Sequence, residues 1–224
     1  MTAIFVSGSG TDVGKTFVTT GLIRHLRREG RTVETIKPLA SGFDPHTLTE
    51  SDTGALLSAL DRPLNMAEAA RISPWRFAAP LSPDMAAERE GRAIDFRAVA
   101  AFCHKAVAAR QGHLFIEGIG GIMVPLDQSH TILDLMTELR LPLLLVTGTY
   151  VGTISHTLTA LQVLARRNLA IAAIVVSESH GSAATLEETV ATLVRFSDLV
   201  DVIGIPRLAA SAEHPAFADI ARLF

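Results

Sequence analysis

Short runs of consecutive apolar residues alternate along this chain with longer stretches in which apolar residues recur every three or four positions. The apolar and β-branched runs lie at residues 3–6, 32–36, 113–116, 141–146, 171–176 and 200–205. Runs this short are typical of strands buried in a parallel sheet. The spaced pattern, seen for example at Val18, Leu22 and Leu26, places apolar side chains on one face of a helix. The pattern therefore predicts strands that alternate with amphipathic helices.

The predicted helices cover residues 17–26, 53–60, 95–110, 132–139, 153–167 and 185–196, with a short one after Pro215. Asp52 could cap the second of these helices, and Asp95 the third, because a carboxylate accepts hydrogen bonds from the first free amides of a helix. In the helix over 153–167, the spacing of Leu158, Leu161 and Leu164 predicts that these three side chains point inward.

Strands that alternate with helices predict a mostly parallel, doubly wound α/β sheet. We expect about seven strands, with helices on both faces. No linker rich in proline, glycine or serine and no internal repeat interrupts the sequence. We therefore expect residues 1–224 to form one P-loop α/β domain. Residues 61–94 contain four prolines and fit no regular pattern, and long excursions of this kind are usually functional.

Composition and charge narrow the range of functions. Hydrophobic residues make up 48% of the chain and aromatic residues 5%, which indicates an aliphatic core. The net charge of -3 argues against non-specific binding to nucleic acid. The apolar runs are too short to span a bilayer, and no signal peptide opens the chain. We expect a cytoplasmic protein without a zinc site, in which Cys103, the one cysteine, is a small buried residue.

The stretch Gly8–Thr16 follows the first strand and opens the first helix. It matches the P-loop pattern G-x-x-x-x-G-K-[ST], except that Ser9 stands where the pattern has glycine. Backbone amides of such a loop, together with the helix N-terminus, hold phosphate oxygens. Lys15 would reach the β- and γ-phosphates, and the hydroxyl of Thr16 would bind Mg²⁺. The stretch predicts a nucleoside triphosphate site.

Further polar residues follow other predicted strands and should meet this loop. Lys37 and Ser41 come after the second strand, and Glu117 comes directly after the third. The carboxyl ends of parallel strands share one edge of a sheet, which is where ligands bind in open α/β folds. A carboxylate at the end of a buried strand is the arrangement that supports Mg²⁺ in P-loop proteins. The glycines that follow Glu117 let the backbone approach a ligand closely.

With these residues in place, the sequence resembles the dethiobiotin synthetase family of P-loop enzymes. The shared segments, which run almost from end to end, are Gly-x-x-Thr-Asp-Val-Gly-Lys-Thr, Lys37–Gly42, Ser51-Asp52, Pro80-x-Ser82-Pro83, Glu90–Arg92, Glu117–Gly121, Val124–Leu126 and Gly204–Pro206. Gly-Lys-Thr alone is weak evidence, but these segments in this order are specific. The resemblance implies an ATP-dependent ligase of biotin synthesis that works as a homodimer. In that family, carbon dioxide adds to one amine of 7,8-diaminopelargonate, ATP phosphorylates the carbamate, and the second amine closes the ring.

The resemblance also implies a role for particular residues. Lys37 and Lys15 would be catalytic, and Thr16, Asp52 and Glu117 would hold Mg²⁺. Substrate would bind at Thr11, Ser41, Gly118, Gly121 and Ser155. ATP would bind at Asp12, Val13, Gly14, Lys15, Thr16, Phe17, Asp52, Glu117, Gly118, Ile119, Gly120, Ser177, Glu178, Pro206, Arg207 and Leu208.

Two positions depart from the family pattern. Ser177-Glu178 stands where relatives often have Asn-Asp, and the asparagine there reads the adenine edge. A hydroxyl makes fewer hydrogen bonds than an amide, so we expect relaxed base selectivity. Ser155 stands where relatives often have an asparagine that reaches the substrate carboxylate of the dimer partner. Amides at the helix N-terminus near Thr153 could bind this carboxylate instead.

Two other classes of protein remain as alternatives. A partition-type ATPase switch would carry a signature lysine at position 10, where this chain has Gly10, and it would lack the Lys-Pro-x-x-Ser-Gly segment. An amidotransferase-type synthetase would need a glutaminase domain or a cysteine nucleophile, and Cys103 has no such context. A regulatory copy without catalysis is disfavoured because Lys15, Lys37 and Glu117 are all present.

Overall fold

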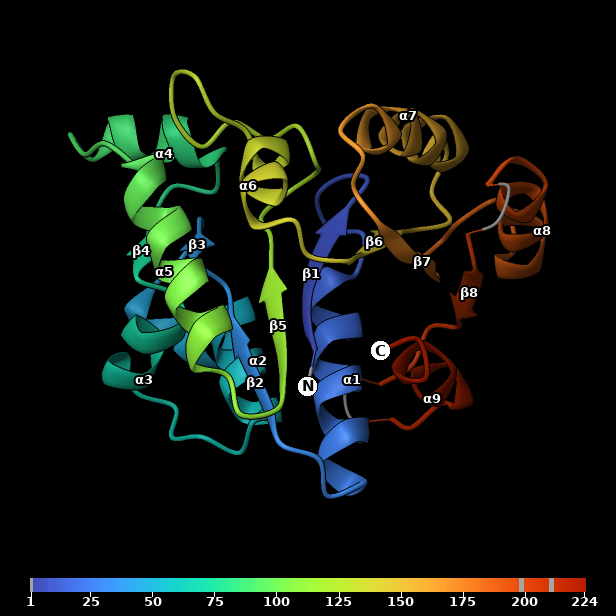
Figure 1. Ribbon diagram of the computed structural model, residues 1–224, viewed down its shortest axis with the longest axis horizontal. Coiled ribbons are helices and arrows are strands. Elements are labelled where there is room, and N and C mark those ends of the chain that lie inside the picture. Colours follow the sequence, from blue (N-terminus) through green and yellow to red (C-terminus); the bar gives the residue numbers. More distant parts are fainter. Residues whose placement is uncertain (1, 198–199, 210–211) are drawn as a thin grey trace.

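The computed structural model describes residues 2–197, 200–209 and 212–224. Within these residues, a six-stranded sheet has the order β2-β5-β1-β6-β7-β8 (Figure 1). Its strands are β1 (Ala3–Gly8), β2 (Val33–Ile36), β5 (His113–Glu117), β6 (Leu143–Thr147), β7 (Ile171–Ser177) and β8 (Val202–Ile205). All of the pairings in this sheet are parallel. The prediction of a parallel α/β sheet is confirmed.

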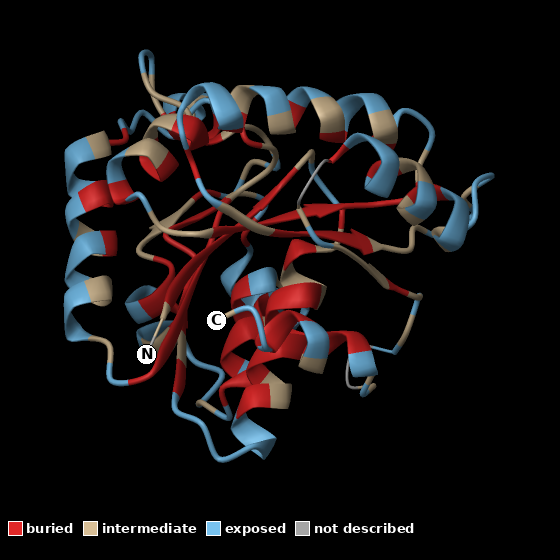
Figure 2. Ribbon diagram, turned by 45° about the vertical axis from the view of Figure 1, so that its right-hand side comes forward, coloured by how far each residue is buried: buried red, intermediate tan, exposed pale blue. Residues whose placement is uncertain are grey.

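Helices cover both faces of this sheet (Figures 1 and 2). They are α1 (Lys15–Arg28), α2 (Asp52–Ala59), α3 (Met66–Ile72), α4 (Pro83–Arg89), α5 (Phe96–Ala109), α6 (Ile132–Leu139), α7 (Thr153–Arg166), α8 (Leu186–Phe196) and α9 (Pro215–Ala221). Every residue of β1, β5 and β6 is buried, as apolar runs enclosed by helices require. None of the helices in the described part of the chain has the length and apolar character needed to cross a membrane.

The prediction that Cys103 is a small buried residue is confirmed. Its neighbour in α5, Phe102, contacts Trp75 edge-on, with 5.7 Å between the ring centroids. Cys103 is fully buried in α5, and burial raises the pKa of its thiol to about 12. A thiol with such a pKa is an apolar packing group rather than a nucleophile.

The excursion over residues 61–94 is more regular than predicted. It contains α3, α4 and the short strand β4 (Trp75–Arg76), which pairs in parallel with β3 (Leu39–Ala40). Backbone hydrogen bonds between distant residues maintain this second sheet, for example from Phe43 N to Phe77 O at 2.9 Å. The six long strands and these two short ones replace the expected count of about seven. Strands of two residues carry no periodicity that a sequence could display.

The start of α2 corrects another expectation. The hydroxyl of Ser51 accepts a hydrogen bond from Gly54 N at 3.0 Å, so Ser51 is the N-cap. Asp52 is the first residue of α2 and does not cap it. Its carboxylate contacts Lys37 instead. The expected cap of α5 is confirmed, because the Asp95 side chain accepts hydrogen bonds from two backbone amides.

The inward face of α7 differs from the prediction. Leu164 is fully buried, but Leu158 and Leu161 are only half-buried and pack toward α8. Thr153 and Thr157 occupy the buried positions on the first two turns instead. A hydrophobicity pattern does not predict buried threonines, because their burial depends on hydrogen-bond partners from other elements.

Helix α9 packs against α1 through the middle of that helix. A Cβ atom on Gly21 would lie 2.2 Å from the ring of Phe217, so only glycine allows this approach. Phe17, one turn earlier, lies 6.0 Å from Phe217 between ring centroids. Glycine inside a helix costs about 0.5–1 kcal/mol relative to alanine. The close packing of the Phe217 ring offsets this cost and fixes α1, whose first residue is Lys15.

Candidate active site

The glycine-rich loop between β1 and α1 is held by the neighbouring strands. Ser9 N donates to Val146 O at 2.9 Å, and Ile122 N donates to Gly8 O at 3.1 Å. Gly14 has a φ of 93°, in the left-handed region that favours glycine. A Cβ atom there would also lie 2.6 Å from Ser177 Oγ. The loop thus needs glycine at Gly14 for both its backbone angle and its close contact with β7.

Lys15 begins α1 and points back over the loop. Its Nζ donates to Gly10 O at 3.1 Å, and the residue is only 7% exposed. Burial, and next the charge of Lys37, lower the pKa of Lys15 to about 8. A phosphate group would supply the anionic partner that this buried ammonium lacks.

Lys37 lies between two carboxylates brought by different elements. Its Nζ is 2.5 Å from Asp52 Oδ2 and 2.8 Å from Glu117 Oε1. Burial by itself would lower the pKa of Lys37, but Glu117 and Asp52 raise it above its ordinary value. Burial would likewise raise the pKa of Asp52, and Lys37 instead holds it below its usual range. Lys37 and Asp52 are therefore both charged at neutral pH.

Thr16 joins the same cluster, because its Oγ1 donates to Glu117 Oε1 at 2.6 Å. Glu117 is completely buried, and its other oxygen, Oε2, has no hydrogen-bond partner. A buried carboxylate oxygen without a partner is costly unless a cation or donor satisfies it. Two carboxylates and a hydroxyl are the hard oxygen donors that Mg²⁺ prefers. These residues fit a magnesium ion.

A cleft of about 630 Å³ lies over this cluster. Most of the residues predicted for the site line it: Thr11, Asp12, Gly14, Lys15, Thr16, Phe17, Lys37, Ser41, Asp52, Ile119 and Gly120. The cleft is also lined by Pro80, Leu81, Ser82, Pro83 and Val124, to which the sequence reasoning assigned no role. The sequence did contain a signal for the first four of these residues. The segment Pro80-x-Ser82-Pro83 is shared with the family, and it lies within residues 61–94, which we expected to be functional.

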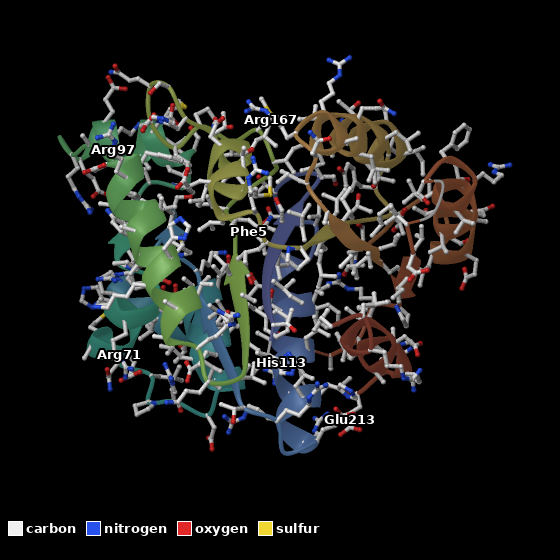
Figure 3. All side chains as sticks on the ribbon, viewed as in Figure 1. Phe5, Arg71, Arg97, His113, Arg167 and Glu213 are labelled. Carbon is white, nitrogen blue, oxygen red and sulfur yellow. The ribbon has the colours of Figure 1, made fainter. Side chains whose placement is uncertain are left out.

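Three predicted substrate residues lie outside the lining of this cleft. Gly118 N donates to Val6 O at 2.9 Å, and a Cβ atom on Gly118 would lie 3.0 Å from the ring of Phe5, a residue of β1 that Figure 3 labels. A Cβ on Gly121 would lie 3.2 Å from Ser9 O. Gly118 therefore packs against β1, and Gly121 packs against the P-loop. Ser155 is exposed on α7.

A second cavity of about 380 Å³ shares Asp12, Gly14 and Phe17 with the first. Five more of the predicted nucleotide residues gather here: Val13, Ser177, Glu178, Arg207 and Leu208. Glu117 and Gly118 line neither cavity. Ser179 and His180 also line it and were missed by the sequence reasoning. Pro206 does not line it, but Arg207 N donates to Glu178 Oε2 at 2.8 Å and so fixes that loop. The two cavities meet at the N-terminus of α1.

A strand, a glycine-rich loop, a helix that opens on Lys15 and Thr16, and a carboxylate from the adjacent strand define a P-loop nucleotide-binding protein. A family model described as "AAA domain" matches residues 2–214. Among solved structures, chloroplast FtsY from Physcomitrella patens has a TM-score of 0.49 at 18% identity and covers 100% of this chain and 65% of its own. A likeness at this level carries no argument about function.

Curated relatives are much more similar. The ATP-dependent dethiobiotin synthetase BioD of Methylobacterium nodulans is 46% identical over 213 residues, which is 92% of this chain and 94% of the relative. The enzyme of the same name from Acidiphilium cryptum is 44% identical over 196 residues, 87% of this chain and 88% of the relative. The chain belongs to the dethiobiotin synthetase family.

Proposed function

We propose that this chain catalyses the ATP-dependent ring closure of 7,8-diaminopelargonate with carbon dioxide, which yields dethiobiotin, ADP and phosphate. The family membership supports the reaction. One observation carries the assignment of the site: Asp52, Lys37, Glu117 and Thr16 form a continuous chain of contacts beneath the cleft, next to Lys15. We further propose that one domain, residues 1–224, carries the whole site, and that the protein works in the cytoplasm.

The reaction explains why two buried lysines line the cleft. One amine adds to carbon dioxide and gives a carbamate, which is a weak electrophile. Transfer of the γ-phosphoryl group from ATP gives this carbamate a leaving group, and attack by the second amine expels phosphate. Negative charge from both reactants accumulates between the carbamate and the γ-phosphate during transfer. Catalysis in such a step comes from positioning and from charge stabilisation.

Lys15 and Lys37 are placed to supply that stabilisation. Both are nearly buried and both line the cleft, so their charges act where water screens them poorly. We assign Lys15 to the β- and γ-phosphates. We assign Lys37 to the carbamate and the transferred phosphoryl group, because Asp52 and Glu117 keep its ammonium charged and fixed.

Thr16, Asp52 and Glu117 would hold Mg²⁺. The donor set and the unpartnered Glu117 Oε2 support this assignment. Among the described residues, no group of three or more His, Cys, Asp or Glu side chains forms a metal cluster. The site would therefore leave positions for water and for phosphate oxygens, as magnesium sites commonly do. A bound Mg²⁺ would neutralise the charge on the phosphates.

We assign the second cavity to the nucleotide base. Glu178, in its lining, accepts a hydrogen bond from Arg207 N. We propose relaxed base selectivity, because the hydroxyl of Ser177 makes fewer hydrogen bonds than the amide that relatives often have there. Ser155 is exposed near the N-terminus of α7, and we propose that this region of each subunit meets the substrate carboxylate in a homodimer.

The direct test is product formation. The purified protein is incubated with the diamine, bicarbonate, Mg²⁺ and ATP. The products are then separated and identified by mass spectrometry. We expect a cyclic urea whose formation requires all four components, with one ADP released for each ring. ATP hydrolysis that does not depend on the diamine, with no cyclic product, would refute the proposal.

A further inference from the structure

The hydroxyl of Ser9 points away from the phosphate cleft and toward the next strand. Ser9 Oγ lies 2.8 Å from Thr147 Oγ1, at the end of β6, and 3.4 Å from the hydroxyl of Tyr150. Glycine at this position of the P-loop pattern would make neither contact. The residue that departs from the pattern therefore links the loop to the segment between β6 and α7.

Thr147 is fully buried and contacts three other hydroxyls. Thr157 Oγ1 donates to it at 2.8 Å, and Thr153 Oγ1 lies 2.7 Å away. Thr153 already donates its one hydroxyl hydrogen to Gly148 O at 2.7 Å, so Thr147 is the donor to Thr153. The hydrogen of Thr147 is then committed. Ser9 must donate to Thr147.

The same reasoning extends outward to α7. Because Ser9 gives its hydrogen to Thr147, the contact between Ser9 and Tyr150 requires Tyr150 as the donor. The Tyr150 hydroxyl also lies 3.0 Å from His156 Nδ1, and it has no second hydrogen to give. A chain of donation that is continuous from α7 to the loop therefore needs hydrogen on Nδ1 of His156. With hydrogen there, one direction of donation runs from His156 through Tyr150, Ser9, Thr147 and Thr153 to Gly148 O.

We propose that this chain of hydrogen bonds, defined by His156, Tyr150, Ser9 and Thr147, positions the P-loop for the phosphates of ATP. Ser9 is adjacent to Gly10, whose carbonyl accepts from Lys15 Nζ, so a fixed Ser9 fixes the partner of that lysine. The four residues are positioning residues, since none of them lines either cavity. This inference rests on the proposed nucleotide site. Its tests measure ATP-analogue binding and a histidine tautomer, so they do not depend on ring closure.

The first experiment measures binding of a fluorescent ATP analogue to the full chain. We expect Ser9→Ala to weaken binding about fivefold, the loss typical of one hydrogen bond, and Ser9→Thr to restore it. In turnover assays the same loss should appear in KM for ATP more than in kcat. Ser9→Ala combined with Tyr150→Phe should bind as Ser9→Ala does, because the two residues act in one chain. The control is Thr159→Ala, which removes an exposed hydroxyl from α7, the helix that carries His156.

The second experiment reads the proton on His156 directly. Long-range ¹H–¹⁵N NMR at a pH well above the ordinary histidine pKa distinguishes the two neutral tautomers. We expect Nδ1–H for His156, and Nε2–H, the form that free histidine favours, once Tyr150→Phe removes the acceptor. Finding Nε2–H in the unmodified protein would overturn the inference. Equal ATP-analogue binding by Ser9→Ala and Thr159→Ala would also overturn it.

Discussion

In the described part of the chain, two clusters that place one cation between two carboxylates can be compared. In the first, Lys37 contacts Asp52 and Glu117 under the cleft. In the second, Arg62 lies between Glu34 on β2 and Glu68 on α3. The shorter contact of Arg62, 2.6 Å from its Nη2 to Glu34 Oε2, resembles the 2.8 Å from Lys37 Nζ to Glu117 Oε1. The second contacts differ, with 2.5 Å from Lys37 Nζ to Asp52 Oδ2 and 3.8 Å from Arg62 Nη1 to Glu68 Oε2.

The clusters differ in exposure and in how fully they are satisfied. The side chain of Lys37 is 4% exposed and that of Glu117 is 0% exposed, whereas the side chains of Arg62 and Glu34 are 22% and 40% exposed. The third members have the opposite order, since the side chain of Asp52 is 55% exposed and that of Glu68 is 18% exposed. Arg62 Nη2 donates to both oxygens of Glu34, and therefore each oxygen of that carboxylate has a hydrogen-bond partner. Glu117 keeps one buried oxygen without a partner. This difference supports our proposal that the pair of Lys37 and Glu117, which is buried and leaves one carboxylate oxygen open to a ligand, serves the reaction.

Lys37→Gln should have the largest effect. Loss of the ammonium removes charge stabilisation at the transferred group, which typically costs about 10²–10³ in kcat. ATP-analogue binding should stay nearly unchanged, because Lys15 and the loop are intact. Steady-state turnover and analogue titration measure the two quantities. The matched change Arg62→Gln should leave both as they are, and an unaltered kcat in Lys37→Gln would remove Lys37 from the mechanism.

Glu117→Gln should weaken the response to Mg²⁺. The amide offers one weaker oxygen in place of two charged ones, and changes around metal sites commonly cost about 10–100-fold in affinity. A titration of turnover against Mg²⁺ at saturating ATP gives the apparent constant. Glu34→Gln is the control, and thermal unfolding of both variants checks the fold. A Mg²⁺ titration identical to that of the unmodified protein would contradict the ligand role.

Arg62→Gln should have the smallest effect, and on stability alone. Partly exposed ion pairs contribute about 0.2–1 kcal/mol because water screens them and ordering the side chains costs entropy. Chemical denaturation should show a decrease within that range. A loss several times larger would mean that the two clusters are equivalent in their energetics, and the comparison would fail.

The sequence predicted the parts of the site that depend on local pattern. Buried strands are short apolar runs, and the position of Lys37 and Glu117 directly after such runs brings them to one edge of a parallel sheet. The glycine-rich loop is likewise a local signal. These features do not require knowledge of the packing between distant elements.

The remainder depends on contacts between distant segments. Ser51 rather than Asp52 caps α2, because the two residues compete for one position and Lys37, fifteen residues earlier, binds the aspartate. The strands β3 and β4 exist only as each other's partner. The buried threonines of α7 follow from hydroxyls on β6. A linear pattern of apolar and polar residues does not encode these partners.

The contact between Gly21 and Phe217 has a consequence for biosynthesis. Helix α1 leaves the ribosome early, but Phe217, whose ring packs on Gly21, is added almost two hundred residues later. A nascent chain can therefore complete the packing around its phosphate-binding helix only when synthesis is nearly over. Until then, the face of that helix around Gly21 would lack its packing partner.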